Sequence, residues 1–111
     1  MQTSLSAQEE KALALFKKEL GQICASSEWE LRLFGARARG EGDEESDLDC
    51  LVVVKNLDEK TKVRIWDAAY EVFTVTEVLI SPLVLSEQQY QGLKKRERLI
   101  ALDIEREGIR L

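Results

Sequence analysis

Histidine is absent from this chain of 111 residues, and the only cysteines are Cys24 and Cys50. Without histidine, imidazole-based acid–base catalysis and the zinc sites built on histidine are excluded. Neither cysteine belongs to a C-x-x-C pair, and both stand among apolar residues. We therefore expect two buried thiols in a reducing cytoplasm.

Long apolar runs are also missing, and the single proline is Pro82. No stretch is long enough to span a membrane, and the N-terminal MQTSLSAQEEK has no basic region followed by an apolar one. Neither an anchor nor a signal peptide is expected. The hydrophobic content of 44% in 111 residues is enough for one core. We expect a single domain over residues 1–111, in the cytoplasm.

Positive charge is in deficit, because the net charge is -5 while 33% of the residues are charged. Such a field repels the phosphates of free nucleic acid, so stand-alone nucleic-acid binding is not expected. The negative charge suits a basic protein partner. It is equally compatible with a nucleotide whose phosphates arrive with magnesium, so charge alone does not choose between these ligands.

The first half of the chain predicts a helix and two strands. Ser6 and Glu9 have capping-box spacing at the start of a helix over residues 7–24. Residues 28–33 alternate apolar and charged side chains, as in a half-buried strand that ends at Gly35. Residues 47–54 begin polar and continue apolar, as in a central strand. Residues 36–46 between them suit a turn of helix followed by a loop.

The second half predicts a helix over residues 58–73, a strand over residues 74–81 stopped by Pro82, and two further helices. A capping-box pattern at Ser86 opens a short helix before Gly92, and a charged helix covers residues 97–107. The apolar residues at helical spacing in the first of these helices are Val63, Trp66, Tyr70 and Phe73. We expect Trp66, Tyr70 and the last helix to pack against the chain's own sheet, with burial against a partner as the alternative.

Asp47 and Asp49 open the central strand with two carboxylates on one face, about 6 to 7 Å apart along the chain. Like charges this close raise each other's pKa unless a cation lies between them. The pair therefore suits a divalent cation such as magnesium, bound together with substrate phosphate. The alternative is that Asp47 belongs to an acidic surface loop and Asp49 is an exposed strand residue.

Gly35 and Ala36 end the first strand with two small residues, which let a phosphate approach the backbone. The turn of helix that follows would direct free N–H groups at this phosphate. Arg37 and Arg39 place cationic donors nearby. The alternative is an ordinary tight turn with two surface arginines.

Together these features resemble the signature of the polymerase β nucleotidyltransferase superfamily: a glycine and a small residue, ten residues from Arg37 to Ser46, then Asp-x-Asp opening an apolar strand. Residues 33–40 followed by residues 46–49 are similar to the minimal nucleotidyltransferase (MNT) group. The resemblance implies an α/β (α+β) fold, in which helices flank a small mixed sheet of the polymerase β palm type within a single domain.

Members of the superfamily transfer a nucleoside monophosphate from a magnesium nucleoside triphosphate to a hydroxyl. The resemblance implies that Asp47 and Asp49 are catalytic and bind metal. It implies a third carboxylate from a later strand, and Glu77 is the candidate, with an exposed edge-strand glutamate as the alternative. The residues implied in nucleotide and phosphate binding are Gly35, Ala36, Arg37, Arg39 and Ser46.

Ala36 departs from the family pattern, because the family usually has serine at this position. The missing hydroxyl removes a hydrogen bond to phosphate worth about 1.5 to 3 kcal/mol. The backbone contacts remain, so we expect alanine at this position to lower the activity without abolishing it.

Many MNT proteins are antitoxins encoded beside a HEPN-domain ribonuclease toxin, and such antitoxins are reported to add AMP to a tyrosine of the toxin. The resemblance therefore implies ATP as co-substrate, magnesium, and a hetero-oligomer with a HEPN toxin. Residues after about 96 are too few for the helical acceptor domain of larger members, which also favours a protein acceptor. The alternatives are a non-catalytic antitoxin that blocks its partner sterically and a small-molecule nucleotidyltransferase.

Overall fold

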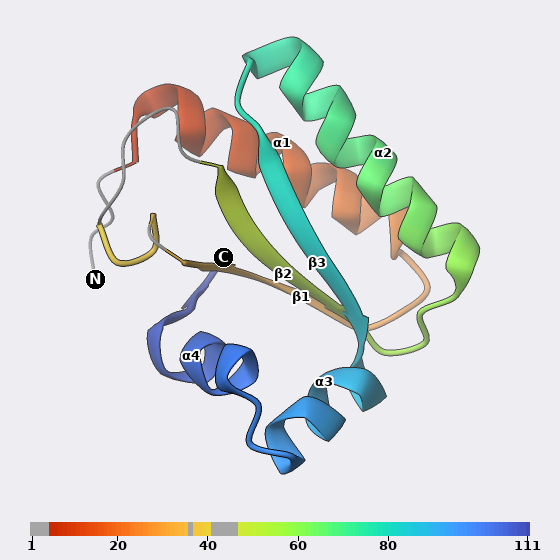
Figure 1. Cartoon of the computed structure of the whole chain (residues 1–111). Coiled ribbons are helices and arrows are strands. Elements are labelled where there is room, and N and C mark those ends of the chain that lie inside the picture. The colour runs from red at the N-terminus through yellow and green to blue at the C-terminus, as the bar shows by residue number, and fades with distance from the viewer. Residues whose placement is uncertain (1–4, 36, 41–46) are drawn as a thin grey trace.

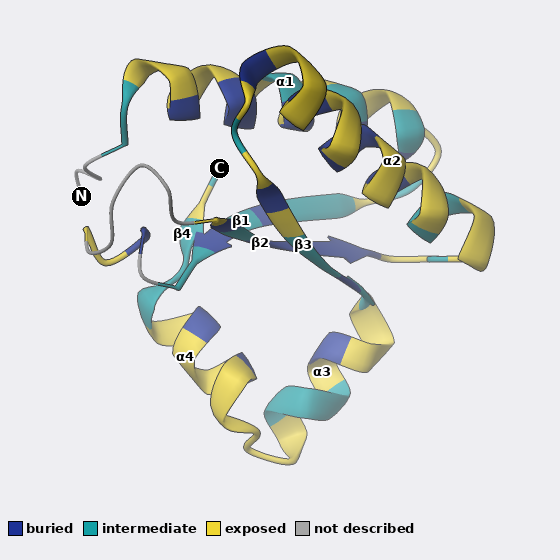
Figure 2. Ribbon diagram, turned by 45° about the horizontal axis from the view of Figure 1, so that its top comes forward, coloured by how far each residue is buried: buried dark blue, intermediate teal, exposed yellow. Residues whose placement is uncertain are grey.

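The computed structural model describes residues 5–35, 37–40 and 47–111, and helices cover both faces of a sheet. Within these residues four strands form one mixed sheet in the order β3-β2-β1-β4. Helices α1 and α2 lie on one face, and α3 and α4 lie on the other (Figures 1 and 2). The elements are α1 (Ala7–Ile23), β1 (Trp29–Phe34), β2 (Leu48–Val54), α2 (Glu59–Thr76), β3 (Ile80–Ser86), α3 (Glu87–Lys95), α4 (Leu99–Glu107) and β4 (Ile109–Arg110).

Strand β2 is central, as its apolar sequence predicts, and it pairs antiparallel with β1 and parallel with β3. Its alternate residues serve two cores. Cys50, Val52 and Val54 pack with α1 and α2, while Leu51 and Val53 pack with α3 and α4. Because side chains alternate along a strand, Asp49 projects to the same face as Leu51 and Val53.

The capping box at the start of α1 is present as predicted. The Ser6 hydroxyl accepts from the Glu9 N–H at 3.1 Å, and Glu9 Oε1 accepts from the Ser6 N–H at 2.8 Å. The same pattern at Ser86 opens α3. Helix α3 does not end at Gly92 but continues to Lys95, because a glycine inside a helix weakens it without ending it.

The predicted third strand is wrong in its position. Helix α2 extends to Thr76, and β3 begins at Ile80 and passes through Pro82. The Leu79 carbonyl accepts from the Leu48 N–H, so alternate residues of β3 direct their backbone groups to β2. Pro82 is one of the residues between these, whose backbone groups point away from β2, and its nitrogen therefore faces the open edge of the sheet. An edge strand tolerates proline at such a position.

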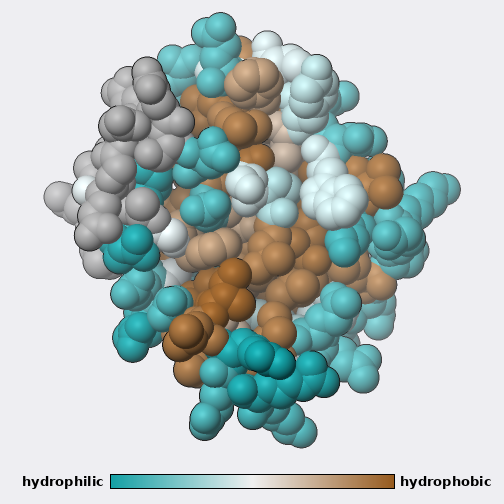
Figure 3. Space-filling view, in the orientation of Figure 1, coloured by the Kyte–Doolittle hydropathy of each residue, from teal (hydrophilic) through white to brown (hydrophobic). Residues whose placement is uncertain are grey.

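The predicted buried face of α2 is also wrong. The helix buries Ile65, Ala68, Ala69, Val72 and Thr76, whereas Trp66 is 46% and Tyr70 is 67% exposed. Aromatic residues therefore remain at the surface of α2. Figure 3 shows further apolar surface over β3 and α4. On α4 the exposed apolar residues are Leu99, Ile100 and Leu102. Packing of Trp66 and Tyr70 into the chain's own core is excluded, although Ala101 and Ile104 anchor α4 as expected.

Cys24 and Cys50 are free and buried, as the sequence predicts. In the part of the chain that the structure describes, no helix combines the length and apolar character needed to cross a membrane.

Candidate active site

Asp49 lies near the start of β2, and Asp47 immediately precedes that strand. Asp49 is half-buried and Asp47 is exposed. Burial raises the pKa of Asp49, and the negative charge of Asp47 raises it further. The two carboxylates therefore interact unfavourably when both are ionised, which is the property expected of a pair that binds a cation.

Gly35 holds the chain against Asp49. Its φ is +79°, a conformation that glycine adopts without strain, and a Cβ built there would lie 2.4 Å from Asp49 Oδ2. The contact follows from the sheet, because Phe34 and Asp49 are partners in the antiparallel register of β1 and β2. The sequence predicted a glycine for phosphate approach, and the structure shows that it also makes room for a carboxylate.

Residues 37–40 form a hydrogen-bonded turn, in agreement with the turn predicted after Gly35. The Gly35 carbonyl accepts from Ala38 N–H at 3.2 Å and from Arg39 N–H at 3.3 Å, and the Arg37 carbonyl accepts from Gly40 N–H at 3.2 Å. Ala38 is buried and fixes the turn to the core. These bonds hold the amides of Ala38, Arg39 and Gly40 within the turn.

The Arg37 side chain points to the start of α1. Its side chain is 4% exposed, and its Nη2 lies 2.7 Å from Glu9 Oε1, which is 2% exposed. The guanidinium is therefore held by α1, and the predicted contact of Arg37 with phosphate stays a prediction. The sequence signal for its partner was the capping-box glutamate, whose second role requires the tertiary structure.

Arg39 remains at the surface beside Gly35. Its Nη1 lies 3.1 Å from Glu107 Oε2 of α4. Together with Gly35, it borders a cavity of about 310 Å³. The lining residues are Phe34, Gly35, Arg39, Ile100, Asp103 and Glu107. This cavity connects the Gly35 turn with the exposed apolar residues of α4.

Glu77 is not on the third strand. It caps the C-terminus of α2 with φ +61°, before β3 begins. The β3 residue in register with Asp49 is Ser81, which shares its face of the sheet. The sequence reasoning included Ser81 in its strand over residues 74–81 but missed its place beside Asp49, because it looked for an acid and took Glu77. Among the described residues, no group of three or more acidic or thiol side chains is placed to hold a metal.

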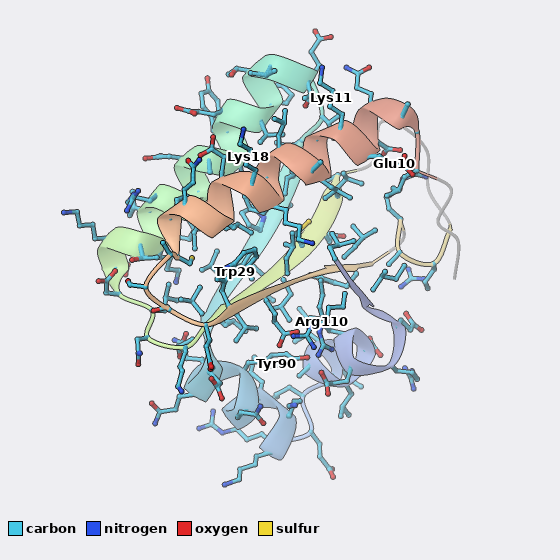
Figure 4. The ribbon with its side chains drawn as sticks, turned by 180° about the vertical axis from the view of Figure 1, so that it is seen from behind. Glu10, Lys11, Lys18, Trp29, Tyr90 and Arg110 are labelled. Atoms are coloured by element: carbon cyan, nitrogen blue, oxygen red, sulfur yellow. The ribbon has the colours of Figure 1, made fainter. Side chains whose placement is uncertain are left out.

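Ala36 and Ser46 lie outside the described residues, so their predicted phosphate contacts stay predictions. Another cavity, of about 530 Å³, includes Trp29, Val53, Tyr90 and Arg110 in its lining. Figure 4 shows Trp29 beneath α1, and Tyr90 and Arg110 on the opposite side of the sheet. Val53 lies toward the far end of β2 from Asp49, so this cavity is separate from the carboxylate pair.

The chain is similar in sequence to known nucleotidyltransferases. The model of the nucleotidyltransferase domain family matches residues 13–105. A protein of Methanocaldococcus jannaschii named "Putative protein adenylyltransferase" is 39% identical over 70 residues, which are 62% of this chain and 71% of that protein. A crystal structure of "a putative nucleotidyltransferase from Sulfolobus solfataricus" is 20% identical, covers 96% of this chain and 87% of its own, and gives a TM-score of 0.49. The match over residues 13–105 places this chain in the nucleotidyltransferase domain family, and the protein is a nucleotidyltransferase.

Proposed function

We propose that this protein is a magnesium-dependent adenylyltransferase that transfers AMP from ATP to a hydroxyl group of a partner protein. The observation that carries the proposal is the contact between the Gly35 turn and Asp49. It brings a backbone suited to phosphate against a carboxylate suited to a cation, and the substrate of such a site is a metal-bound triphosphate.

Asp47 and Asp49 fit a hard divalent cation. Both offer carboxylate oxygens, and the raised pKa of Asp49 reflects burial together with the charge of Asp47, a combination that a cation would relieve. Magnesium bound there supplies charge neutralisation for the triphosphate and the departing pyrophosphate. Ser81 stands beside Asp49 where a third acid was expected, so this chain contributes a hydroxyl from β3 at that position.

The proposed reaction is the transfer of AMP from ATP to the acceptor hydroxyl. The acceptor hydroxyl oxygen forms a bond to the α-phosphorus of ATP, the bond from that phosphorus to the bridging oxygen breaks, and pyrophosphate leaves. The hydroxyl proton passes to water. The Gly35 turn binds and orients the phosphates, and Arg39, which lines the adjacent cavity, adds positive charge.

A protein acceptor is supported by two observations. The relative from Methanocaldococcus jannaschii is named as a protein adenylyltransferase. In addition, Ile100 lines the cavity beside Gly35, and it continues to the exposed Leu99 and Leu102, so apolar surface adjoins the site. We propose a HEPN-domain toxin as the acceptor, modified on tyrosine, with this protein as its antitoxin.

The test is incubation with α-labelled ATP, magnesium and the protein encoded beside this gene. Label should appear on that protein, and both Asp47→Asn and Asp49→Asn should lower its rate about 100-fold or more, since several kcal/mol of transition-state stabilisation depend on the metal. Asp67→Asn is the matched control, because Asp67 is an exposed carboxylate on α2. Its rate should equal that of the wild type.

Label that persists in both site variants would exclude the mechanism. No label on the partner, combined with inhibition of the partner by the unmodified protein alone, would instead support the non-catalytic antitoxin. Label on a free hydroxyl compound without any partner would support small-molecule transfer.

A further inference from the structure

Arg37 and Glu9 form a buried ion pair outside the carboxylate site. The distance from Arg37 Nη2 to Glu9 Oε1 is 2.7 Å, and the two side chains are 4% and 2% exposed. They come from segments 28 residues apart, the helical turn after Gly35 and the first turn of α1. The pair therefore connects the phosphate-binding turn to the helical layer.

Glu9 is itself held in place. Its Oε1 also accepts from the Ser6 N–H at 2.8 Å, and its own N–H donates to the Ser6 hydroxyl at 3.1 Å. Burial acts to raise the pKa of Glu9, but the bonds from Ser6 and the charge of Arg37 outweigh it, and the pKa is lowered. Arg37 thus meets an ionised carboxylate fixed to the start of α1.

A buried ion pair is a costly way to stabilise a fold, because removing two charges from water offsets most of their attraction. Apolar side chains of similar volume would fill the same space. The pair does have a geometric effect, since Arg37 lies within the turn that closes on the Gly35 carbonyl. Gly35 in turn sits against Asp49 Oδ2, where a displacement below 1 Å changes the contact.

We infer that Arg37 and Glu9 are positioning residues, which hold the Gly35 turn in register with Asp49 for nucleotidyl transfer. Arg37 acts through the backbone of its turn and not by touching the nucleotide, since its guanidinium is buried against α1. The expected change in kcat rests on the proposed function. The position of the turn can be measured without AMP transfer.

The experiment compares the wild type with the double variant Glu9→Leu/Arg37→Met, which removes both charges and keeps apolar volume. A single substitution would leave one charge buried without its partner and unfold the chain. Glu28→Leu/Lys55→Met is the matched control, because these exposed residues form a 3.5 Å ion pair at the other end of the sheet. Arg37→Lys tests rescue by a conservative change.

Four quantities are measured: thermal stability, the amide resonance of Gly35, the Kd for magnesium ATP, and kcat of AMP transfer. In the double variant we expect a folded protein with a Tm within a few degrees of the wild type, a shifted Gly35 resonance and a kcat about tenfold lower. The control variant should match the wild type in all four. Arg37→Lys, which keeps the charge, should recover kcat to within about threefold of the wild type.

A folded double variant with an unchanged Gly35 resonance and unchanged Kd and kcat would overturn the inference. If the wild type transfers no AMP, the proposed function fails, and the Gly35 resonance still decides whether the ion pair positions the turn. A shifted resonance then supports positioning, and an unshifted one excludes it.

Discussion

Gly35 is the residue at which backbone conformation and chemistry depend on each other most directly. Its φ of +79° and the 2.4 Å approach of a built Cβ to Asp49 Oδ2 both require glycine. We expect Gly35→Ala to destabilise the fold by about 1 to 3 kcal/mol through strain. AMP transfer should fall about 100-fold or more, because the carboxylate must move. Urea unfolding and the labelling assay measure the two effects.

Gly92 provides the control for that substitution. It lies inside α3 with ordinary backbone and nothing within 4 Å of a built Cβ. Gly92→Ala should stabilise the protein by about 0.5 to 1 kcal/mol and leave transfer unchanged, because alanine restricts the unfolded chain and favours helix. Equal effects of the two substitutions would contradict the special role of Gly35.

The ionised Asp49 side chain should lower the free energy of unfolding. Its folded-state pKa is raised by burial and by the charge of Asp47. A carboxyl of this kind destabilises the folded state at pH values above its folded pKa, and the penalty is lost as the pH falls through that pKa toward the ordinary value of 3.8. Metal-free Asp49→Asn should therefore have a higher Tm than the wild type at pH 7.

The difference in Tm should shrink as the pH falls toward 3.8. Magnesium should raise the Tm of the wild type and not that of Asp49→Asn. A melting series across pH, with Asp67→Asn as the surface control, measures this. An Asp49→Asn variant less stable than the wild type at pH 7 would show that the carboxylate has a structural partner.

Helix α2 has one face buried against the protein and one face exposed to solvent. Ile65 is fully buried, whereas Val63 is 44% exposed on the same helix. Ile65→Ala should cost about 2 to 5 kcal/mol, because it leaves a cavity under the helix. Val63→Ala should change stability by no more than about 0.5 kcal/mol. Urea midpoints compared at constant m-value distinguish the two, and similar costs would place Val63 in the core.

The same helix explains where prediction from sequence fails. Periodicity shows that a helix is amphipathic, and it located α2 correctly to within a few residues. The size of Trp66 and Tyr70 predicted that they define the apolar face, yet the smaller Ala68, Ala69 and Val72 are the buried residues. Close packing of a helix favours small side chains, so residue size in the sequence gave the wrong face.

Whether a strand lies at the edge or in the centre of a sheet also depends on tertiary structure. Pro82 stops a strand only if its nitrogen faces a neighbouring strand, and in β3 it faces the open edge. The capping boxes, β1 and β2 were predictable because their signals are local. Asp49 and Gly35 were predictable as a pair because β1 and β2 are consecutive antiparallel strands. Ser81 and the Glu9–Arg37 pair depend on long-range contacts, which no local pattern contains.

At the scale of the whole molecule, Cys50 reports on global unfolding. It lies at the centre of the sheet, is 0% exposed, and burial raises the pKa of its thiol to about 12. A thiol reagent at pH 8 therefore meets little thiolate and no access in the folded state. Cys24 lies at the C-terminal end of α1, where fraying of the helix offers a local route to reaction.

Magnesium ATP should protect the two cysteines unequally. At a hundred times its Kd, a ligand of the folded state lowers the unfolded population about 100-fold. Labelling of Cys50, followed by mass spectrometry, should slow by the same factor, and labelling of Cys24 should slow less because local opening needs no release of ligand. Asp49→Asn should abolish the protection at both positions. If Asp49→Asn were protected as strongly as the wild type, the nucleotide would bind elsewhere, because a ligand at any site of the folded state slows global unfolding.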